Sequence, residues 1–293
     1  MWIADNWKDY RLIDSSEGEK LEYWGKYLLR RPEPQAVWQK KSDAKLWNRA
    51  DAVYHRSSSG GGHWRFISKK LPERWEVHYN DMTFNIKPMG FKHTGLFPEQ
   101  AVNWDWFSAI IKNAAQTGTK VRVLNLFAYT GGATVAALKA GAEVVHVDAS
   151  KGMVTWAKEN VVSSGLADAP VRYIVDDVKK FVKREIRRGR QYDAVIMDPP
   201  SYGRGPSGEV WKIENELYPL ITDCMSILSD NPLFFLINSY TTGLSPAVLT
   251  NILTYTMSGK YGGEITADEI GLPMESNGLI MPCGISGRWR STN

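Results

Sequence analysis

Short apolar runs and helical periods alternate along this chain from about residue 119 onward. The apolar runs predict strands near 121–127, 143–148, 171–175, 193–198, 232–238, 264–270 and 278–285. The segments between them have helical spacing, which predicts helices near 131–140, 151–164, 177–188, 209–229 and 245–258. Strands that alternate with helices favour right-handed crossovers and a parallel sheet. The last two strands are joined by the short turn 273–277, so they should pair antiparallel. We expect an α/β fold with a doubly wound, mostly parallel, seven-stranded sheet that contains one antiparallel strand.

The pattern before residue 91 is different. Short β-like segments lie at 65–67, 75–79 and 83–87, broken by glycine, proline and Asn-Asp. Asn80-Asp81 separates two alternating segments, which predicts a hairpin. Residues 57–62 read as a mobile loop. We therefore expect a small β-rich domain over 1–90 and a larger α/β domain over 91–293, with an amphipathic helix from Val102 to Ala114.

Composition excludes several classes of protein. The chain has 293 residues, 43% apolar and 23% charged, which is typical of a soluble globular protein. No apolar run approaches the roughly 20 residues that span a bilayer, and the first residues lack the order of a signal peptide. Two cysteines, Cys224 and Cys283, form no disulfide framework, so we expect a cytoplasmic protein without a membrane partner. The net charge of +4 is compatible with nucleic-acid binding, and nothing indicates an oligomeric state.

Residues 124–133 carry the strongest chemical signal. A strand ends in a small-residue turn, a helix follows at once, and Asp148 ends the next strand. This order is typical of a sheet that binds an adenosine-containing cofactor. Gly131 and Gly132 allow the backbone to approach the ligand closely. Asp148 is predicted to accept hydrogen bonds from ribose hydroxyls, or alternatively to cap the helix that starts near Ser150.

The turn distinguishes two cofactors. A dinucleotide site takes Gly-x-Gly-x-x-Gly, but Phe127, Tyr129 and Gly132 occupy these positions here. This favours S-adenosylmethionine, which has no phosphate, and leaves an NAD-dependent oxidoreductase as a rival. The residues expected to contact the cofactor on these elements are Asn125, Phe127, Ala128, Tyr129, Thr130, Gly131, Asp148 and Ala149.

The third strand ends in Asp176-Asp177. We expect Asp177 to accept a hydrogen bond from the adenine amino group, and capping of the next helix is the alternative. That helix carries seven cationic residues between 179 and 190, which either bind a phosphate backbone or form a solvated face.

A second strong signal follows the fourth strand, in Asp198-Pro199-Pro200-Ser201-Tyr202. Proline cannot continue a central strand, so the chain must leave the sheet at its carboxyl end. Asp198 and the carbonyl of Pro199 are predicted to hold the N–H groups of an amine that receives a methyl group, and Tyr202 to stack on its base. These three are the candidate catalytic residues, and Asp198 is also a candidate cofactor contact. The alternative is a simple Asp-Pro turn, and residues 201–206 read as a flexible loop over the substrate.

Metal ligation is not expected. The five histidines show no ligand spacing, and methyl transfer needs alignment of the reactants rather than a metal.

Taken together, these motifs resemble the class I S-adenosylmethionine-dependent methyltransferases that include the bacterial RlmI-like ribosomal RNA large-subunit methyltransferases. The matching segments are Leu124–Gly132, Asp148-Ala149-Ser150, Asn160, Asp198–Tyr202 and 93–100, with His93 where the family has lysine. The resemblance implies S-adenosylmethionine as cofactor and an RNA base, in ribosomal RNA, as substrate. It also implies that Phe97 and Gln100 close over the methionine end of the cofactor.

The sequence departs from the family in two places. Asn238-Ser239-Tyr240 stands where the family's 5-methylcytosine enzymes have Ser-Cys-Ser, and carbon methylation needs a thiolate. A base nitrogen is therefore the favoured acceptor. Residues 1–90 show no clear match to the usual N-terminal RNA-binding domain of the family. We expect a cytoplasmic RNA methyltransferase, with a non-catalytic RNA-binding or assembly protein as a further alternative.

Overall fold

The computed structural model describes residues 1–57, 61–204, 208 and 210–292. The chain forms two compact units. Unit 1 comprises Met1–Val102 and Ile270–Cys283, and unit 2 comprises Asn103–Glu269 and Gly284–Asn293. Residues 58–60 of one predicted loop and 205–206 of the other lie outside the described residues. The units do not by themselves define domains, so a boundary at residue 90 stays a prediction.

Unit 1 is built on two small sheets. Strands β2 (Tyr10–Ser16), β3 (Glu19–Trp24), β4 (Tyr27–Pro32), β5 (Ala52–Arg56) and β6 (Gly62–Phe66) form a five-stranded sheet in sequence order. All neighbours are antiparallel except β4 and β5. The predicted hairpin is confirmed as β7 (Trp75–Tyr79) and β8 (Met82–Ile86), with Asn80 at φ 52° in the turn. The described residues of this unit also include the short helices α1 (Ala44–Trp47) and η1 (Pro98–Gln100).

A buried carboxylate organises one side of this sheet. Asp14 accepts hydrogen bonds from the Ser42 amide, the Trp47 indole and the Ser276 hydroxyl, each at 2.9 Å. Burial of a charged group is tolerated only when its hydrogen bonds are made. These bonds attach the 270–283 segment to the N-terminal strands within unit 1.

The large sheet confirms the predicted fold class. Its order is β1-β16-β17-β15-β12-β9-β10-β11, from β1 (Trp2–Ile3), β16 (Glu264–Pro273), β17 (Ile280–Arg290), β15 (Phe234–Ser239), β12 (Ala194–Met197), β9 (Arg122–Leu126), β10 (Glu143–Asp148) and β11 (Val171–Val175). The pairs among β9, β10, β11, β12 and β15 are parallel, and β17 is antiparallel to β15. The described residues give eight strands rather than seven, because β1 is a two-residue strand too short to leave a pattern.

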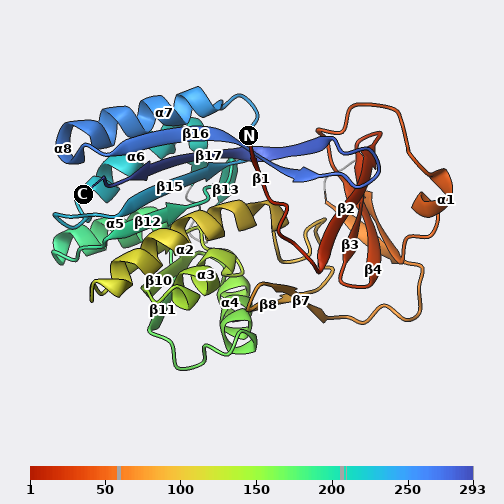
Figure 1. Ribbon diagram of the computed structural model, residues 1–293, viewed down its shortest axis with the longest axis horizontal. Helices are drawn as coiled ribbons and strands as arrows, with labels where there is room; N and C mark the ends of the chain where they lie inside the picture. Colours follow the sequence, from red (N-terminus) through yellow and green to blue (C-terminus); the bar gives the residue numbers. More distant parts are fainter. Residues whose placement is uncertain (58–60, 205–207, 209, 293) are drawn as a thin grey trace. The chain divides into compact units, whose positions relative to one another are not determined.

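Helices of unit 2 cover both faces of the sheet (Figure 1). They are α3 (Gly132–Lys139), α4 (Lys151–Ser163), α5 (Val178–Arg187), α6 (Ile213–Met225), α7 (Pro246–Leu253), a π-helical turn (Thr254–Ser258) and α8 (Gly259–Tyr261), with most of α2 (Ala101–Gln116). Buried apolar residues of α5, α6 and α7 form one core with alternate residues of the central strands, such as Leu124 and Val195. On the other face, the ring of Phe107 in α2 stacks on Phe234 at 5.8 Å. None of the helices in the described ranges is long and apolar enough to cross a bilayer.

One predicted helix is wrong at its start. The sequence pattern predicts a helix over 209–229, but Val210–Lys212 form strand β14, and α6 begins only at Ile213. β14 pairs antiparallel with β13 (Tyr202–Arg204), within the segment predicted as a flexible loop. Trp211 is buried between two exposed neighbours, and this alternation favours a strand.

Candidate functional site

The turn after β9 is held in an unusual backbone conformation. Phe127, Tyr129 and Gly131 have φ of 55°, 50° and 81°, in the left-handed region that side chains rarely adopt. Ala128 lies between them and donates its amide to the carbonyl of Val147 at 3.0 Å. The turn is thereby fixed at the carboxyl end of β9, where open α/β sheets bind ligands.

Helix α4 packs directly against this turn. A Cβ on Gly131 would lie 2.9 Å from the Cβ of Ala157, closer than real Cβ contacts allow. The buried side-chain amide of Asn160 donates to the carbonyl of Thr130 at 2.8 Å. Glycine is therefore required at 131, and Asn160 is a positioning residue for the turn.

Asp148 joins the turn to the end of β10. Its carboxylate accepts the amide of Tyr129 at 2.8 Å and the amide of Ser150 at 2.8 Å. Burial raises the pKa of Asp148, and these two amides act in the opposite direction. The N-cap of α4 is Ser150, which accepts the amide of Met153, so Asp148 does not have the capping role that the sequence leaves open.

The two carboxylates after β11 separate into different roles. Asp176 forms an ion pair with Arg184 at 2.5 Å. Asp177 caps α5 by accepting the amide of Lys180 at 2.9 Å, and it also lines a pocket at the carboxyl edge of the sheet. The capping alternative is thus correct for Asp177, and it is compatible with a ligand contact.

That pocket brings three predicted residues together. It encloses about 170 Å³ and contains Phe127, Ala149 and Asp177. The ring of Trp211 lies 5.0 Å from the ring of Phe127, and its indole donates to the carbonyl of Pro200 at 2.6 Å. The remaining lining residues are Val178, Lys179, Gly203, Arg204 and Val210. Two aromatic rings, the carboxylate of Asp177 and the cationic side chains of Lys179 and Arg204 therefore line the pocket.

The Asp198–Tyr202 segment leaves the sheet where the prolines predict. Asp198 follows β12, and its amide lies 3.4 Å from the carbonyl of Leu126. Pro199 is buried, and Pro200 lines the pocket. Tyr202 begins β13 with half of its surface exposed, and its hydroxyl accepts the Nε of Arg204 at 2.9 Å.

Some predicted cofactor contacts are not among the residues that line this pocket. Asn125 is buried and donates to the hydroxyl of Thr134 at 3.0 Å, which in turn bonds to His146 at 2.9 Å. Phe97 and Gln100 belong to unit 1, where Gln100 is buried in η1. The predicted cofactor contacts of these residues stay predictions.

Sequence reasoning misses Trp211 and Lys179 as pocket residues. The sequence pattern puts Trp211 in a helix, with no motif around it. The alternation of apolar Trp211 and Ile213 around polar Lys212 is the sequence signal that could have indicated a strand there. In the sequence Lys179 is one cation of a charged helix face, and in the structure it forms an ion pair with Glu216 at 2.7 Å.

A family model for S-adenosylmethionine-dependent methyltransferases matches residues 39–214, more than half of the chain. The chain belongs to this family. A crystal structure of an S-adenosylmethionine-dependent methyltransferase from Agrobacterium tumefaciens has the same fold, with a TM-score of 0.91 and 38% identity. The match covers 97% of this methyltransferase and 91% of that chain.

Two curated relatives are similar over part of this methyltransferase. Ribosomal RNA large subunit methyltransferase I of Photobacterium profundum is 28% identical over 56% of the chain. Ribosomal RNA large subunit methyltransferase K/L of Shewanella frigidimarina is 30% identical over 50% of it. The chain spans only 40% and 20% of the lengths of these two relatives.

Proposed function

We propose that this chain transfers the methyl group of S-adenosylmethionine to a nitrogen of an RNA base, in ribosomal RNA. One observation carries the proposal: Asp198-Pro199-Pro200 follows β12 at the same edge of the sheet as the aromatic pocket, and Pro200 belongs to both. An acceptor bound by this motif would lie beside a cofactor bound in the pocket.

The residues of the pocket fit the adenosine part of the cofactor. The rings of Phe127 and Trp211 suit a planar adenine, and Asp177 can accept its amino group. Each oxygen of the Asp148 carboxylate accepts one amide and has a further lone pair, which suits the two ribose hydroxyls. When bound, the cofactor supplies an electrophilic methyl group on a sulfonium.

The contribution of the protein is then alignment of the acceptor. Asp198 and the carbonyl of Pro199 accept the N–H groups of an exocyclic amine and orient its lone pair. Tyr202 stacks on the base that carries the amine. A neutral amine can attack first and lose its proton afterwards, so we assign no general base.

The positions of the thiols support a nitrogen acceptor. Carbon methylation of cytosine requires a thiolate beside the base. Cys224 is fully buried in α6, and burial raises the pKa of its thiol. Cys283 belongs to unit 1, and burial raises its thiol pKa as well. After β15, where the cytosine enzymes carry their cysteine, this chain has Tyr240.

The substrate class is inferred from the relatives, whose names specify ribosomal RNA. We also propose that the reaction takes place in the cytoplasm. Phe97 and Gln100 are proposed to close over the methionine end of the cofactor, as the sequence motif at 93–100 indicates.

Substitution of Asp198 tests the proposal. Asp198→Ala should reduce methyl transfer roughly 100-fold or more, because the amine loses its orientation. Affinity for S-adenosylhomocysteine should fall far less than methyl transfer does, because Asp198 is only one of several candidate cofactor contacts. The matched control is Asp168→Ala, which removes an exposed carboxylate after α4.

The assay transfers labelled methyl from the cofactor to total RNA from a strain that lacks the protein, followed by mass spectrometry of the nucleosides. Methyl transfer that survives Asp198→Ala contradicts the role of this residue. Binding of S-adenosylhomocysteine without any labelled RNA contradicts the substrate and favours a non-catalytic RNA-binding protein.

A further inference from the structure

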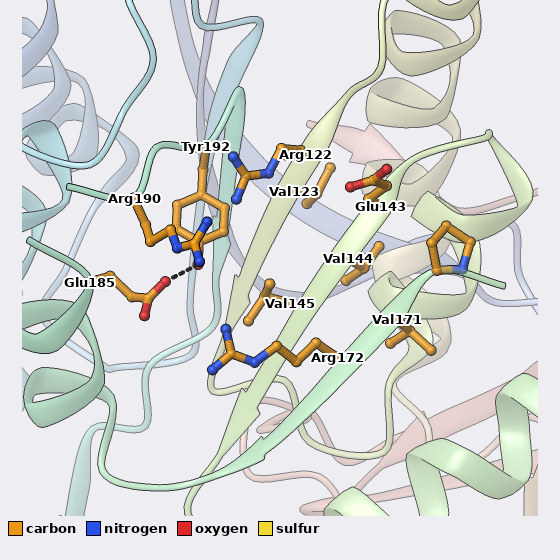
Figure 2. A pocket seen from close by; sticks show the side chains of 11 residues that line it. Arg122, Val123, Glu143, Val144, Val145, Val171, Arg172, Glu185, Arg190 and Tyr192 are labelled. Carbon is orange, nitrogen blue, oxygen red and sulfur yellow. Dashed lines mark hydrogen bonds between the residues drawn. The ribbon is translucent and has the colours of Figure 1, made fainter. Parts of the chain in front are cut away.

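A second cavity of about 360 Å³ lies at the opposite edge of the sheet from the cofactor pocket. Its walls come from the first residues of β9, β10 and β11 and from the segment after α5. In a parallel sheet these strand starts meet at the amino edge. We call it the rear cavity. Figure 2 shows its side chains as sticks, with three arginines among them.

The strand register places the charged residues on one face. Arg122 pairs with Glu143 across β9 and β10, and Arg172 pairs with Val145 across β10 and β11. Directly paired residues of neighbouring strands point to the same side of a sheet. Val145 packs on the core under α5, so Arg122 and Arg172 emerge on the α5 side.

The third arginine comes from the segment after α5. Gly189 has φ of 61° and ends the helix, and the amide of Arg190 returns to the carbonyl of Glu185 at 3.1 Å. Tyr192 follows and is buried at the cavity wall. Its ring lies 5.4 Å from the guanidinium of Arg122.

Two carboxylates, Glu143 and Glu185, line the cavity together with the three arginines. The buried carboxylate of Glu185 accepts the Tyr192 hydroxyl at 2.7 Å, drawn as a dashed line in Figure 2, and it pairs with Arg188 at 3.2 Å. Within the described part of the chain, no carboxylate lies within 4.0 Å of the guanidinium nitrogens of the three lining arginines. Guanidinium groups that are not held in ion pairs are suited to bind phosphate, which they can contact through two parallel N–H bonds.

Helix α5 links the two edges of the sheet. Lys179 lines the cofactor pocket at the start of the helix, and Arg190 lines the rear cavity beyond its end. Lys183 and Arg187 are exposed between them, four residues apart, and therefore lie on one stripe of the helix. A polyanion that reached from one pocket to the other would meet a cation on each turn of α5.

We propose that the rear cavity and this stripe of α5 bind the phosphate backbone of RNA outside the nucleotide that is modified. The inference rests on the proposed RNA substrate, but it concerns a different surface from the cofactor pocket. Phosphate contacts hold the RNA and set its orientation, and they carry no sequence information.

Charge reversal at the rear cavity tests this. The variant carries Arg172→Glu and Arg190→Glu, and the matched control carries Lys112→Glu in α2 and Lys260→Glu in α8, with the same change in net charge. A fluorescent 20-nucleotide single-stranded RNA of mixed sequence is titrated with each protein between 50 and 200 mM KCl. Binding of S-adenosylhomocysteine and thermal unfolding are measured in parallel.

The rear-cavity variant should bind RNA about tenfold or more weakly than the control at low salt. Its plot of log affinity against log salt should be shallower by roughly 0.7 for each lost phosphate contact. If it unfolds early, Arg172→Gln with Arg190→Gln replaces it. Binding of S-adenosylhomocysteine should equal that of the wild type.

Equal RNA affinity and salt slope in variant and control would overturn the proposal. It also fails if inorganic phosphate or an acidic peptide binds the cavity while the RNA does not. Methyl transfer that survives in Asp198→Ala would contradict the proposed role of that residue, but weaker RNA binding by the rear-cavity variant would still support this inference. The titration measures RNA binding and does not depend on methyl transfer, so each of the two proposals can fail without the other.

Discussion

Gly131 shows how a single residue sets the geometry of the turn after β9. It has φ of 81°, and a methyl group there would collide with Ala157 of α4. The sequence predicts glycine for close approach of a ligand, but the structure adds a second reason, the packing of α4 on the turn. Asp148 is equally accessible to sequence reasoning, because it ends a buried strand. The burial of Asn125 is not, because it depends on Thr134 and His146, contributed by other elements.

Gly131→Ala should destabilise the fold by roughly 2 to 4 kcal/mol, from left-handed strain together with the collision. Gly165→Ala is the matched control, because Gly165 has φ of 72° and a Cβ added there would meet no other atom within 4 Å. It should cost about 1 to 2 kcal/mol. Urea unfolding measures both variants. Equal losses of unfolding free energy in the two variants would mean that α4 shifts to accommodate the methyl group without a loss of stability.

His146 makes stability depend on pH. It is fully buried, and burial lowers its pKa from the ordinary value of 6.5 to about 3. Above pH 6.5 both folded and unfolded forms are neutral, and the stability is complete. As the pH falls from 6.5 toward 3 only the unfolded form gains the proton, so about 1.4 kcal/mol is lost per pH unit.

Between pH 6 and 5, the free energy of unfolding of His146→Gln should therefore decrease by about 1 kcal/mol less than that of the wild type. Burial also lowers the pKa of His93 to about 3. The contribution of His93 to the pH dependence of stability therefore remains in this variant. The exposed His55→Gln is the control and should follow the wild type. Parallel curves for all three proteins would show that His146 does not stay neutral in the folded state.

At the scale of elements, the sequence predicts what the hydrophobic pattern controls. Strands β9, β10 and β12 are buried apolar runs, and their positions agree with the prediction to within a residue or two. Sequence reasoning misses strands β2, β3 and β4. In the structure, Glu17 and Gly18 both have positive φ and form the hairpin turn between β2 and β3. The β13–β14 hairpin is missed because its strands have three residues each and are defined by Trp211 packing on Phe127.

Trp211 should therefore decide whether the hairpin forms one wall of the cofactor pocket. Trp211→Ala should weaken binding of S-adenosylhomocysteine about tenfold or more, since both the ring and the bond to Pro200 are lost. Trp211→Phe keeps a ring and should lose less. Calorimetric titration measures both variants. Unchanged affinity in Trp211→Ala would place the adenine elsewhere.

At the scale of the whole molecule, unit 1 is assembled from distant parts of the sequence. Its strand β1 pairs with Ile270 and Gly271, and Ser15 contacts the sulfur of Met274. Sequence patterns are local, so they could not show that residues 270–283 complete a unit that begins at Met1. The match to the Agrobacterium structure over 97% of the chain supports the fold as a whole.

A fragment of residues 1–102 should therefore fail to fold alone, because the buried Leu12 and Asp14 lose partners from 274–276. The same fragment joined to 270–283 by a Gly-Ser linker should recover a cooperative transition. Circular dichroism during thermal unfolding compares the two. A cooperative transition in the shorter fragment, as stable as in the longer one, would contradict this account of unit 1.

Strand β11 is the outermost strand of the large sheet, so one side of its backbone lacks a neighbouring strand among the described residues. An edge strand can pair with a strand from another molecule, and charged side chains oppose that pairing. Arg172 sits near the start of this strand and Val175 at its end is exposed. Beyond any part in RNA binding, Arg172 should keep the protein from self-association, so a neutral replacement is expected to raise light scattering on storage more than glutamate does.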